Sequence, residues 1–375
     1  MQNEVKDFLS SVEKNEVFPD SHISVKIDRE QIDKIIRNLQ SYKTSGIDEI
    51  PNEFLRFGGD ALVDSLVDLF TIITDLEAVP DDWQNDIIKS LLKAGSVYDI
   101  DNYRGITLTS NMYKVYSKIL EESVMTYLEE NNILGEVQEA FRKNRRTEDH
   151  IFTLQGICSI RKAKKYKTFL AFLDLSKAFD RVWRDGLFYL LWKTGIQGKC
   201  WKLLKSLYSN VSNKVLFGNC ETDFFDQEFG LKQGCVLSPA LFSDLMNDLV
   251  SLLEANNVGA ELSSQLVNCL LFADDVVLIG KSEAELHRLL DITANFASKW
   301  NLKFNQNKSM VMIIGKRLDK DKKWQLGNLL LEEANEYKYL GVYFTRSLTF
   351  AYHINCYLKD NFERKLNYMT IKVAK

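Results

Sequence analysis

The sequence lacks the patterns that indicate disulfide-stabilised or zinc-dependent proteins. Its six cysteines are scattered without a Cys-x-x-Cys pair, and its four histidines form neither a His-Glu-x-x-His motif nor a cluster with cysteine. We therefore expect buried free thiols and no zinc site. Proline is also scarce, with four residues, whereas 45% of the chain is hydrophobic. This composition supports a packed core and argues against wholesale disorder.

Long apolar runs and a surplus of positive charge are missing as well. No segment is long and apolar enough for a membrane span, and the polar start Met1–Asp7 does not resemble a signal peptide. We expect an intracellular protein without a membrane partner, in either the nucleus or the cytoplasm. The net charge of −4 argues weakly against nucleic-acid binding. Two basic runs, 142–146 and 161–167, nevertheless concentrate cations, although such runs are as often plain solvated surface.

Apolar periodicity predicts an α+β arrangement of antiparallel strands with helices on one face. Capping boxes of the Ser/Asp-x-x-Glu/Gln type predict helix starts after Asp28 and at Ser282, and Pro239 fits the first turn of another helix. The predicted helices cover residues 28–39, 61–76, 107–128, 239–253 and 282–300. The predicted strands cover residues 83–92, 168–173, 267–272, 276–279, 308–314 and 339–344.

Three aspartates stand where apolar strands end. Asp174 follows the run 168–173, and Asp274 and Asp275 form the tip of a hairpin. Burial and mutual repulsion should raise their pKa values, so a lysine or a hard divalent cation is needed to keep them ionised. Such a cluster suits two-metal nucleotidyl transfer. An isolated Asp-Asp pair is more often only a polar turn, and the third aspartate makes the pair informative.

Several motifs occur in a fixed order between about Ser45 and Phe344. They are Lys93-Ala94-Gly95, 102–108 (Asn-Tyr-Arg-Gly-Ile-Thr-Leu), 172–180 (Phe-Leu-Asp-Leu-Ser-Lys-Ala-Phe-Asp), 230–239 (Gly-Leu-Lys-Gln-Gly-Cys-Val-Leu-Ser-Pro), Phe272-Ala273-Asp274-Asp275, Asn305-Gln306-Asn307-Lys308 and Tyr339-Leu340-Gly341. This pattern resembles the reverse transcriptase domain of non-LTR (LINE-type) retrotransposons. Group II intron and other cellular reverse transcriptases share part of it.

The resemblance implies the chemistry of the site. Asp174 and Asp274 would bind two Mg²⁺ ions, with Mn²⁺ as an alternative, and Asp275 would support them. The carbonyl of Leu175 would add a metal ligand, and Lys308 would act as a general acid on the leaving pyrophosphate. Without the motif context, Lys308 would be read as a solvated lysine at a strand start.

The resemblance also implies nucleotide and nucleic-acid contacts. The dNTP-binding residues would be Lys93, Arg104, Phe179 and Gln233. Phe179 would exclude a 2′-hydroxyl by its bulk. Template and primer would contact Arg142, Arg145, Arg146, Gly234, Tyr339, Leu340 and Gly341. Ordinary alternatives exist for each of these, namely surface charge, a core phenylalanine or a simple turn.

The implied fold is a right-hand polymerase with fingers, a ferredoxin-like antiparallel palm and a truncated thumb. The expected parts are an N-terminal extension (1–25), fingers (26–165 with 184–229), a palm (166–183 and 230–345) and the start of a thumb (346–375) with a helix-like stretch at 362–373. The partners would be an RNA template, a DNA primer and dNTPs. The endonuclease and thumb of a longer element protein would be missing.

Two residues depart from the family pattern. Gly105 stands where many relatives have proline, and Ala140 stands where glycine is usual. We expect Ala140 to stiffen a loop near the template, because alanine resists positive φ.

Two readings compete with an active reverse transcriptase. An RNA-dependent RNA polymerase shares the palm, but Phe179 and Ala273 count against it. A retroelement remnant would bind RNA without extending a primer, and the intact aspartates count against that reading.

Overall fold

The chain folds into two compact units. A computed structural model describes residues 1–14, 23–93, 95–218, 220–262, 265–315 and 323–359. The first unit combines Met1–Leu134 with Lys177–Asn247, and the second combines Gly135–Ser176 with Asp248–Lys375. Among the helices that the structure describes, none combines the length and the apolar composition needed to cross a bilayer.

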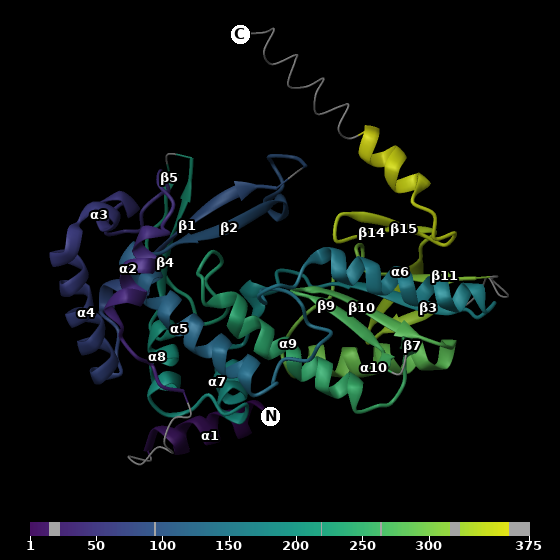
Figure 1. The fold of residues 1–375 in the computed structure, drawn as a ribbon, viewed down its shortest axis with the longest axis horizontal. Coiled ribbons are helices and arrows are strands. Elements are labelled where there is room, and N and C mark those ends of the chain that lie inside the picture. The colour runs from purple at the N-terminus through teal and green to yellow at the C-terminus, as the bar shows by residue number, and fades with distance from the viewer. Residues whose placement is uncertain (15–22, 94, 219, 263–264, 316–322, 360–375) are drawn as a thin grey trace, which may run out of the picture. The chain divides into compact units, whose positions relative to one another are not determined.

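The first unit is built from helices around a five-stranded sheet (Figure 1). The helices are α1 (Gln2–Lys14), α2 (Arg29–Arg37), α3 (Asn52–Phe57), α4 (Gly59–Leu76), α5 (Asn111–Glu130), α7 (Arg184–Lys193) and α8 (Gly198–Tyr208). The strands are β1 (Asn85–Leu92), β2 (Tyr103–Leu108), β4 (Ser212–Phe217), β5 (Cys220–Glu221) and β6 (Phe225–Asp226). Strand β1 lies in the middle, antiparallel to β2 and parallel to β4.

The second unit carries a six-stranded sheet in the order β12-β13-β11-β3-β10-β9. Its main strands are β3 (Thr168–Asp174), β9 (Cys269–Phe272), β10 (Asp275–Gly280), β11 (Met310–Ile314), β12 (Trp324–Leu326) and β13 (Leu329–Glu333). Two small hairpins are β7 (Ala260–Leu262) with β8 (Gln265–Val267), and β14 (Glu336–Tyr339) with β15 (Val342–Thr345). Its helices are α6 (Thr147–Ala163) and α10 (Glu283–Lys299). The remaining helix, α9 (Ser238–Glu254), begins within the residues of the first unit and ends within those of the second.

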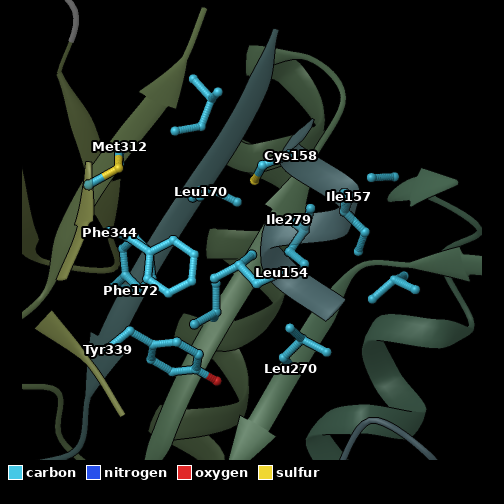
Figure 2. Packing of buried hydrophobic residues seen from close by; sticks show 14 residues of the cluster. Leu154, Ile157, Cys158, Leu170, Phe172, Leu270, Ile279, Met312, Tyr339 and Phe344 are labelled. Carbon is cyan, nitrogen blue, oxygen red and sulfur yellow. The ribbon is translucent and has the colours of Figure 1, made fainter. Parts of the chain in front are cut away.

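The core of the second unit forms where α6 covers the middle of this sheet (Figure 2). Leu154 and Ile157 on the helix pack against Leu170 and Phe172 of β3 and Ile279 of β10, and all five are buried. Residues 168–173 are buried without exception, so both faces of β3 are covered. A strand buried on both faces reads as a continuous apolar run, which explains why this strand could be predicted from its sequence.

Most predicted elements agree with the structure to within a few residues. Asp28 caps α2 by accepting a hydrogen bond from the Gln31 amide (2.9 Å), and Ser282 caps α10 in the same way. The strand predicted at 339–344 is wrong, because it is the hairpin β14–β15. Leu340 (φ 45°) and Gly341 (φ 85°) form its turn, and two consecutive positive φ values are incompatible with a continuous strand.

Other expectations need correction or lie outside the described part. The sheet is not purely antiparallel, since β11 pairs with β13 in parallel. The start of the predicted 107–128 helix is extended, because residues 107–108 belong to β2. The helix-like stretch at 362–373 falls outside the described residues. All six cysteines are free thiols, and Cys158, Cys200, Cys235 and Cys269 are buried as expected, whereas Cys220 is exposed and Cys356 half-buried.

Contacts between distant segments decide to which unit residues 135–165 and 230–247 belong. Residues 135–165 belong to the second unit, because the Leu271 amide donates to the Val137 carbonyl (2.9 Å) and α6 covers the sheet. Residues 230–247 belong to the first unit, where the Gly230 amide donates to the Val182 carbonyl (2.8 Å).

Truncation of the β3 core should destabilise the protein strongly. Leu170 is fully buried, so Leu170→Ala leaves a cavity and should lower the free energy of unfolding by about 2–5 kcal/mol. Leu266→Ala on β8 is the matched control, because that side chain is 42% exposed and its loss should cost under about 0.5 kcal/mol. Urea unfolding of both variants checks the difference, and equal losses would contradict the assigned core.

Candidate active site

Strand pairing brings Asp174 and Asp275 directly opposite each other. Strands β3 and β10 are antiparallel, with Asp174 facing Asp275 and Leu173 facing Val276 in register. Asp274 and Ala273 form the two-residue turn between β9 and β10, whose end residues Phe272 and Asp275 are paired. Residues one hundred positions apart therefore meet at one end of the sheet, as the sequence predicted for this part of the chain.

A turn after α10 holds the backbone of Asp174 on both sides. The Asp174 amide donates to Ser309 Oγ (3.2 Å), and its carbonyl accepts from the Asn305 amide (2.8 Å). The amides of Lys308 and Ser309 donate to the Asn305 carbonyl (3.2 and 2.9 Å). The Asn305–Ser309 turn thus anchors Asp174 and places Lys308 beside it.

The carboxylates repel one another in a poorly hydrated position. Burial, together with the charges of Asp274 and Asp174, raises the pKa of Asp275 to about 6, and Lys308 opposes the rise. Lys308 Nζ lies 3.6 Å from Asp174 Oδ2, although its side chain is 62% exposed. Burial and neighbouring carboxylates both disfavour the ionised form of Asp275, so added positive charge would favour that form.

The donor chemistry of this cluster fits a hard divalent cation. Carboxylate oxygens are the ligands that Mg²⁺ prefers, and burial followed by the charges of Asp274 and Asp174 raises the pKa of Asp275. In the described part of the chain, however, no three His, Cys, Asp or Glu side chains are grouped closely enough to hold a metal as they stand. Leu175 is buried and bridges to Phe304, and its carbonyl stays a predicted ligand.

Ala273 adopts a backbone conformation that normally suits glycine. Its φ is 57° at the tip of the hairpin, and such a conformation costs a residue with a Cβ about 1–3 kcal/mol. The residue with positive φ therefore directly precedes Asp274 and Asp275. In the loop of Ala140, Phe141 adopts a positive φ (64°), whereas the buried Ala140 does not.

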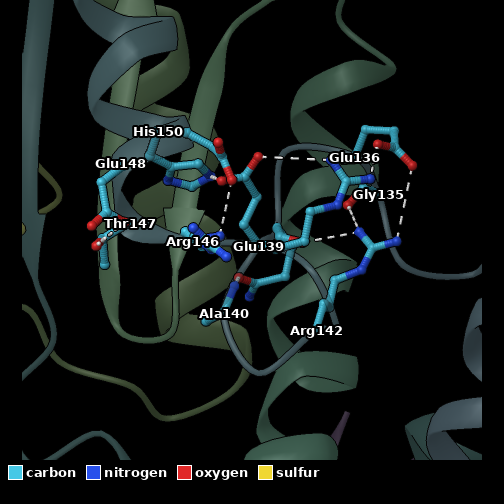
Figure 3. A network of polar contacts seen from close by, with 12 residues as sticks. Gly135, Glu136, Glu139, Ala140, Arg142, Arg146, Thr147, Glu148 and His150 are labelled. Atoms are coloured by element: carbon cyan, nitrogen blue, oxygen red, sulfur yellow. Dashed lines mark hydrogen bonds and ion pairs between the residues drawn. The ribbon is translucent and has the colours of Figure 1, made fainter.

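A polar network in the same unit includes the buried side chains of Glu139 and His150 (Figure 3). His150 Nδ1 is hydrogen bonded to the Tyr339 hydroxyl (3.1 Å), and Nε2 lies 3.2 Å from Glu139 Oε2. The His150 ring also meets the Phe272 ring edge-on at 5.9 Å. The Glu139 amide donates to the Leu271 carbonyl (3.2 Å). This network connects the 135–146 loop, the carboxylate hairpin and the turn at residues 340–341.

The three arginines predicted to contact the template differ in their surroundings. Arg142 donates to the carbonyls of Gly135 (2.9 Å) and Gln138 (3.0 Å), with 6% of its side chain exposed, so it organises the loop from within (Figure 3). Arg145 is ion-paired with Glu136 and lies 3.8 Å from Glu139. Arg146 is exposed at the start of α6.

In the first unit, Gln233 and Arg104 are brought together. With its amide oriented to satisfy both partners, Gln233 donates to the Gly105 carbonyl (2.6 Å) and accepts from Arg104 Nε (3.0 Å). The Gln233 carbonyl accepts from the Thr107 amide (2.7 Å). Gly234 follows with φ 107°, which favours glycine.

Cations from several elements surround Asp180 in this unit. Partial loss of hydration raises the pKa of the Asp180 carboxyl, and Lys177, Lys93 and Arg104 oppose that rise. Lys93 is at the end of the β1–β2 hairpin, where its amide donates to the Asn102 carbonyl (2.9 Å). The charges of Lys93 and Arg104 therefore both act on the Asp180 carboxyl.

Phe179 is supported from behind by a second aromatic ring. It stacks on Phe242 with 4.9 Å between ring centroids and an interplanar angle of 22°. Phe179 is half-buried, whereas Phe242 is fully buried on α9. One face of Phe179 is therefore packed, and its position is fixed more firmly than that of a free surface ring.

Some supporting residues could not have been predicted from sequence. Ser309 and the pair Glu139–His150 act through contacts between segments distant in the chain, and no local motif marks them. Asp180 belongs to a recognised motif, but only the structure places it among cations.

A protein-family model matches the part of the chain that contains these residues. A family model described as reverse transcriptase (RNA-dependent DNA polymerase) matches residues 91–344. That match covers more than half of the chain and includes the carboxylate cluster, Arg104 and Gln233.

Similar proteins come from mobile elements. The chain is 27% identical over 352 residues to the RNA-directed DNA polymerase from mobile element jockey of Drosophila funebris, covering 92% of this chain and 38% of that protein. It is 27% identical over 333 residues to the probable polymerase from transposon X-element of Drosophila melanogaster, covering 86% and 36%. The chain thus spans well under half the length of these relatives.

Solved structures show the fold. Truncated apo telomerase from Candida tropicalis matches with a TM-score of 0.50 and 15% identity, covering 74% of this chain and 57% of that chain. At this identity the likeness concerns the fold alone, which is the mixed α/β fold of a right-hand polymerase.

The buried Glu139–His150 contact should make stability depend on pH. Burial raises the pKa of Glu139 to about 7, with Asp149 adding to the rise and Arg145 and Arg142 opposing it. Burial lowers the pKa of His150 to about 4. Stability from neutral Glu139 is present below its usual 4.5 and is lost as pH rises through 7. Stability from neutral His150 is present above its usual 6.5 and is lost as pH falls through 4.

The two effects oppose each other between 4.5 and 6.5, so only the Glu139 loss remains above that range. Between pH 6 and 8, the unfolding midpoint of the wild type should fall by on the order of 2 °C more than that of Glu139→Gln. Exposed Glu148→Gln on α6 serves as the matched control and should keep the wild-type slope. Calorimetry at several pH values measures this, and parallel curves for Glu139→Gln and wild type would contradict the assignment.

Proposed function

Because the chain belongs to the reverse transcriptase (RNA-dependent DNA polymerase) family, we propose that it extends a primer with dNTPs on an RNA template, as the polymerase part of a longer non-LTR element protein. The observation that carries the proposal is the register of β3 and β10, which puts Asp174 opposite Asp275 beside Lys308. The proposed parts are fingers, a ferredoxin-like palm and the start of a thumb.

The carboxylates of Asp174, Asp274 and Asp275 would hold two divalent cations, Mg²⁺ or alternatively Mn²⁺, with the Leu175 carbonyl as a further ligand. When bound, the ions would favour ionisation of the attacking hydroxyl and neutralise charge on the phosphate. The β3–β10 pairing and the Asn305–Ser309 turn hold the backbone of Asp174, which would limit the reorganisation that accompanies reaction.

The remaining residues would bind and orient the substrates. Lys93 and Arg104 supply cations for the triphosphate, and Gln233 steadies the Arg104 guanidinium. Lys308, which already reaches Asp174, would donate a proton to the leaving pyrophosphate. Gly234 would leave room for the new base pair.

Template and primer would meet the second unit at two places. The exposed Arg146 is the arginine of its run best placed to contact template phosphate, and Arg142 and Arg145 would shape the loop that presents it. The tight turn at Leu340 and Gly341, steadied by Tyr339, would grip the primer end.

Primer extension on poly(rA)/oligo(dT) with Mg²⁺ tests the activity. We expect dNTP incorporation that chelation with EDTA abolishes. Asp274→Asn should lower the rate at least about 100-fold, because loss of a metal ligand removes several kcal/mol of charge stabilisation. Asp291→Asn, an exposed residue on α10, should leave the rate unchanged.

A folded wild-type protein that incorporates no dNTP with either Mg²⁺ or Mn²⁺ would overturn the proposal and favour a remnant that only binds RNA. Incorporation of NTPs in preference to dNTPs would instead favour an RNA-dependent RNA polymerase.

Sugar selection should depend on the ring of Phe179. Phe179→Ala removes the bulk that would clash with a 2′-hydroxyl, so incorporation of rNTPs relative to dNTPs should rise by about 10- to 100-fold. Phe179→Tyr keeps the ring stacked on Phe242 and should retain discrimination. The ratio of kcat/KM for the two nucleotides is the measurement, and an unchanged ratio in Phe179→Ala would refute this role.

A further inference from the structure

The first unit contains a lysine whose charged group is completely buried. The Lys232 side chain is 0% exposed, and its Nζ lies 2.8 Å from Asp86 Oδ2, whose side chain is 1% exposed. The same Nζ donates to the Trp83 carbonyl (3.1 Å) and lies 4.5 Å from the centroid of the Tyr113 ring. Lys232 is the charged residue of the 230–239 motif, and its side chain is fully buried.

Such a pair is a poor device for stability alone. Removing two charges from water costs several kcal/mol per ion, and well-packed apolar residues of similar size are often as stable or more stable. Burial raises the pKa of Asp86 despite the attraction of Lys232, so the pair does not fully recover the lost hydration. The pair is better explained as a contact that fixes the position of one chain segment relative to another.

The pair connects the Gly230–Ser238 segment to strand β1. Asp86 is the second residue of β1, and Trp83 lies just before that strand. The Lys232 carbonyl in turn accepts from Ser238 Oγ (2.8 Å) and from the Cys235 amide (3.1 Å). Lys232 is therefore bound at both its side chain and its backbone.

A second buried cation holds the start of the same segment. Arg184 is 6% exposed, and its Nε donates to the Gly230 carbonyl (2.8 Å) while Nη1 donates to the Tyr208 carbonyl (3.1 Å). Arg184 thus holds Gly230 through its carbonyl, and Lys232 is held through its own ammonium group. The next residue is Gln233, which contacts Arg104 and Gly105 on β2.

We propose that the buried Lys232–Asp86 pair is a positioning device that sets Gln233 against Arg104 and thereby determines the affinity for the incoming nucleotide. The nucleotide part of this inference rests on the proposed function. Lys232 acts through Gln233, and it touches neither substrate nor metal. β1 and β2 run side by side with Ser90 paired to Gly105, so an anchor on β1 fixes the distance to β2.

Removing both charges separates positioning from stability. Asp86→Leu and Lys232→Met singly leave one uncompensated buried charge or one unpartnered carboxyl, so both should lower the unfolding midpoint. The double variant Asp86→Leu/Lys232→Met removes both and should return the midpoint close to the wild-type value. The anchor would still be lost.

Two readouts of the double variant test the proposal. Backbone amides of residues 230–238 should exchange with deuterium faster than in wild type. The KM for dNTPs should rise on the order of 10-fold with little change in kcat, because displacement of Gln233 weakens ground-state and transition-state binding alike. The matched control is Lys214→Met/Glu221→Leu, a pair between β4 and β5 in the same unit at 2.8 Å, with Glu221 58% exposed. It should change neither readout.

Each outcome is decisive. A folded double variant with wild-type exchange and wild-type KM overturns the proposal, because Gln233 would then keep its position without the pair. If the double variant fails to fold, Asp86→Asn/Lys232→Gln keeps the shape without the charges and takes the same measurements. Absence of primer extension in the wild type would overturn the proposed function only, since exchange in the 230–238 segment still tests the positioning.

Discussion

Like charges at the end of an apolar sheet are the constraint on which the second unit depends. Asp174 and Asp275 are forced together by antiparallel pairing, and burial already raises the pKa of Asp275 to about 6. The two carboxylates repel each other in this arrangement, so the backbone that carries them must be held in place by other contacts. The buried strand β3 and the turn at residues 305–309 supply that restraint. Further positive charge would favour the ionised carboxylates, and this makes the cluster a candidate for metal-assisted chemistry.

Buried polar side chains follow one pattern in both units. His150 in the second unit and Lys232 and Arg184 in the first are almost fully enclosed, and each contacts two or more segments that are distant in sequence. Apolar residues could fill the same volumes at lower cost in hydration, but they would not fix a direction. In each case the segment so fixed contains a motif residue, Tyr339 or Gln233. Directional contacts are therefore concentrated where the position of a loop matters most.

How much could be predicted from the sequence follows from the range of each interaction. Strand β3 and the β9–β10 hairpin were predictable because double burial gives continuous apolar runs, and the convergence of Asp174 with Asp275 followed from them. The hairpin at 336–345 was misread as one strand because Leu340 gives no sign of its positive φ. The Lys232–Asp86 pair could not be predicted from the sequence. The two residues are 146 positions apart, and each charged residue taken alone is most simply interpreted as solvent-exposed.

The two candidate clusters differ in how many side-chain contacts hold their residues in place. The nucleotide-side residues form a connected network, in which Gln233 holds Arg104 and buried cations hold the segment around Gln233. The carboxylate side has a fixed backbone but no ready cage of side chains among the described residues. Backbone register places Asp174 opposite Asp275, and a bound cation would supply the positive charge that favours one shared coordination shell. On the proposed function, the sheet and the ion would set the geometry of the carboxylates together.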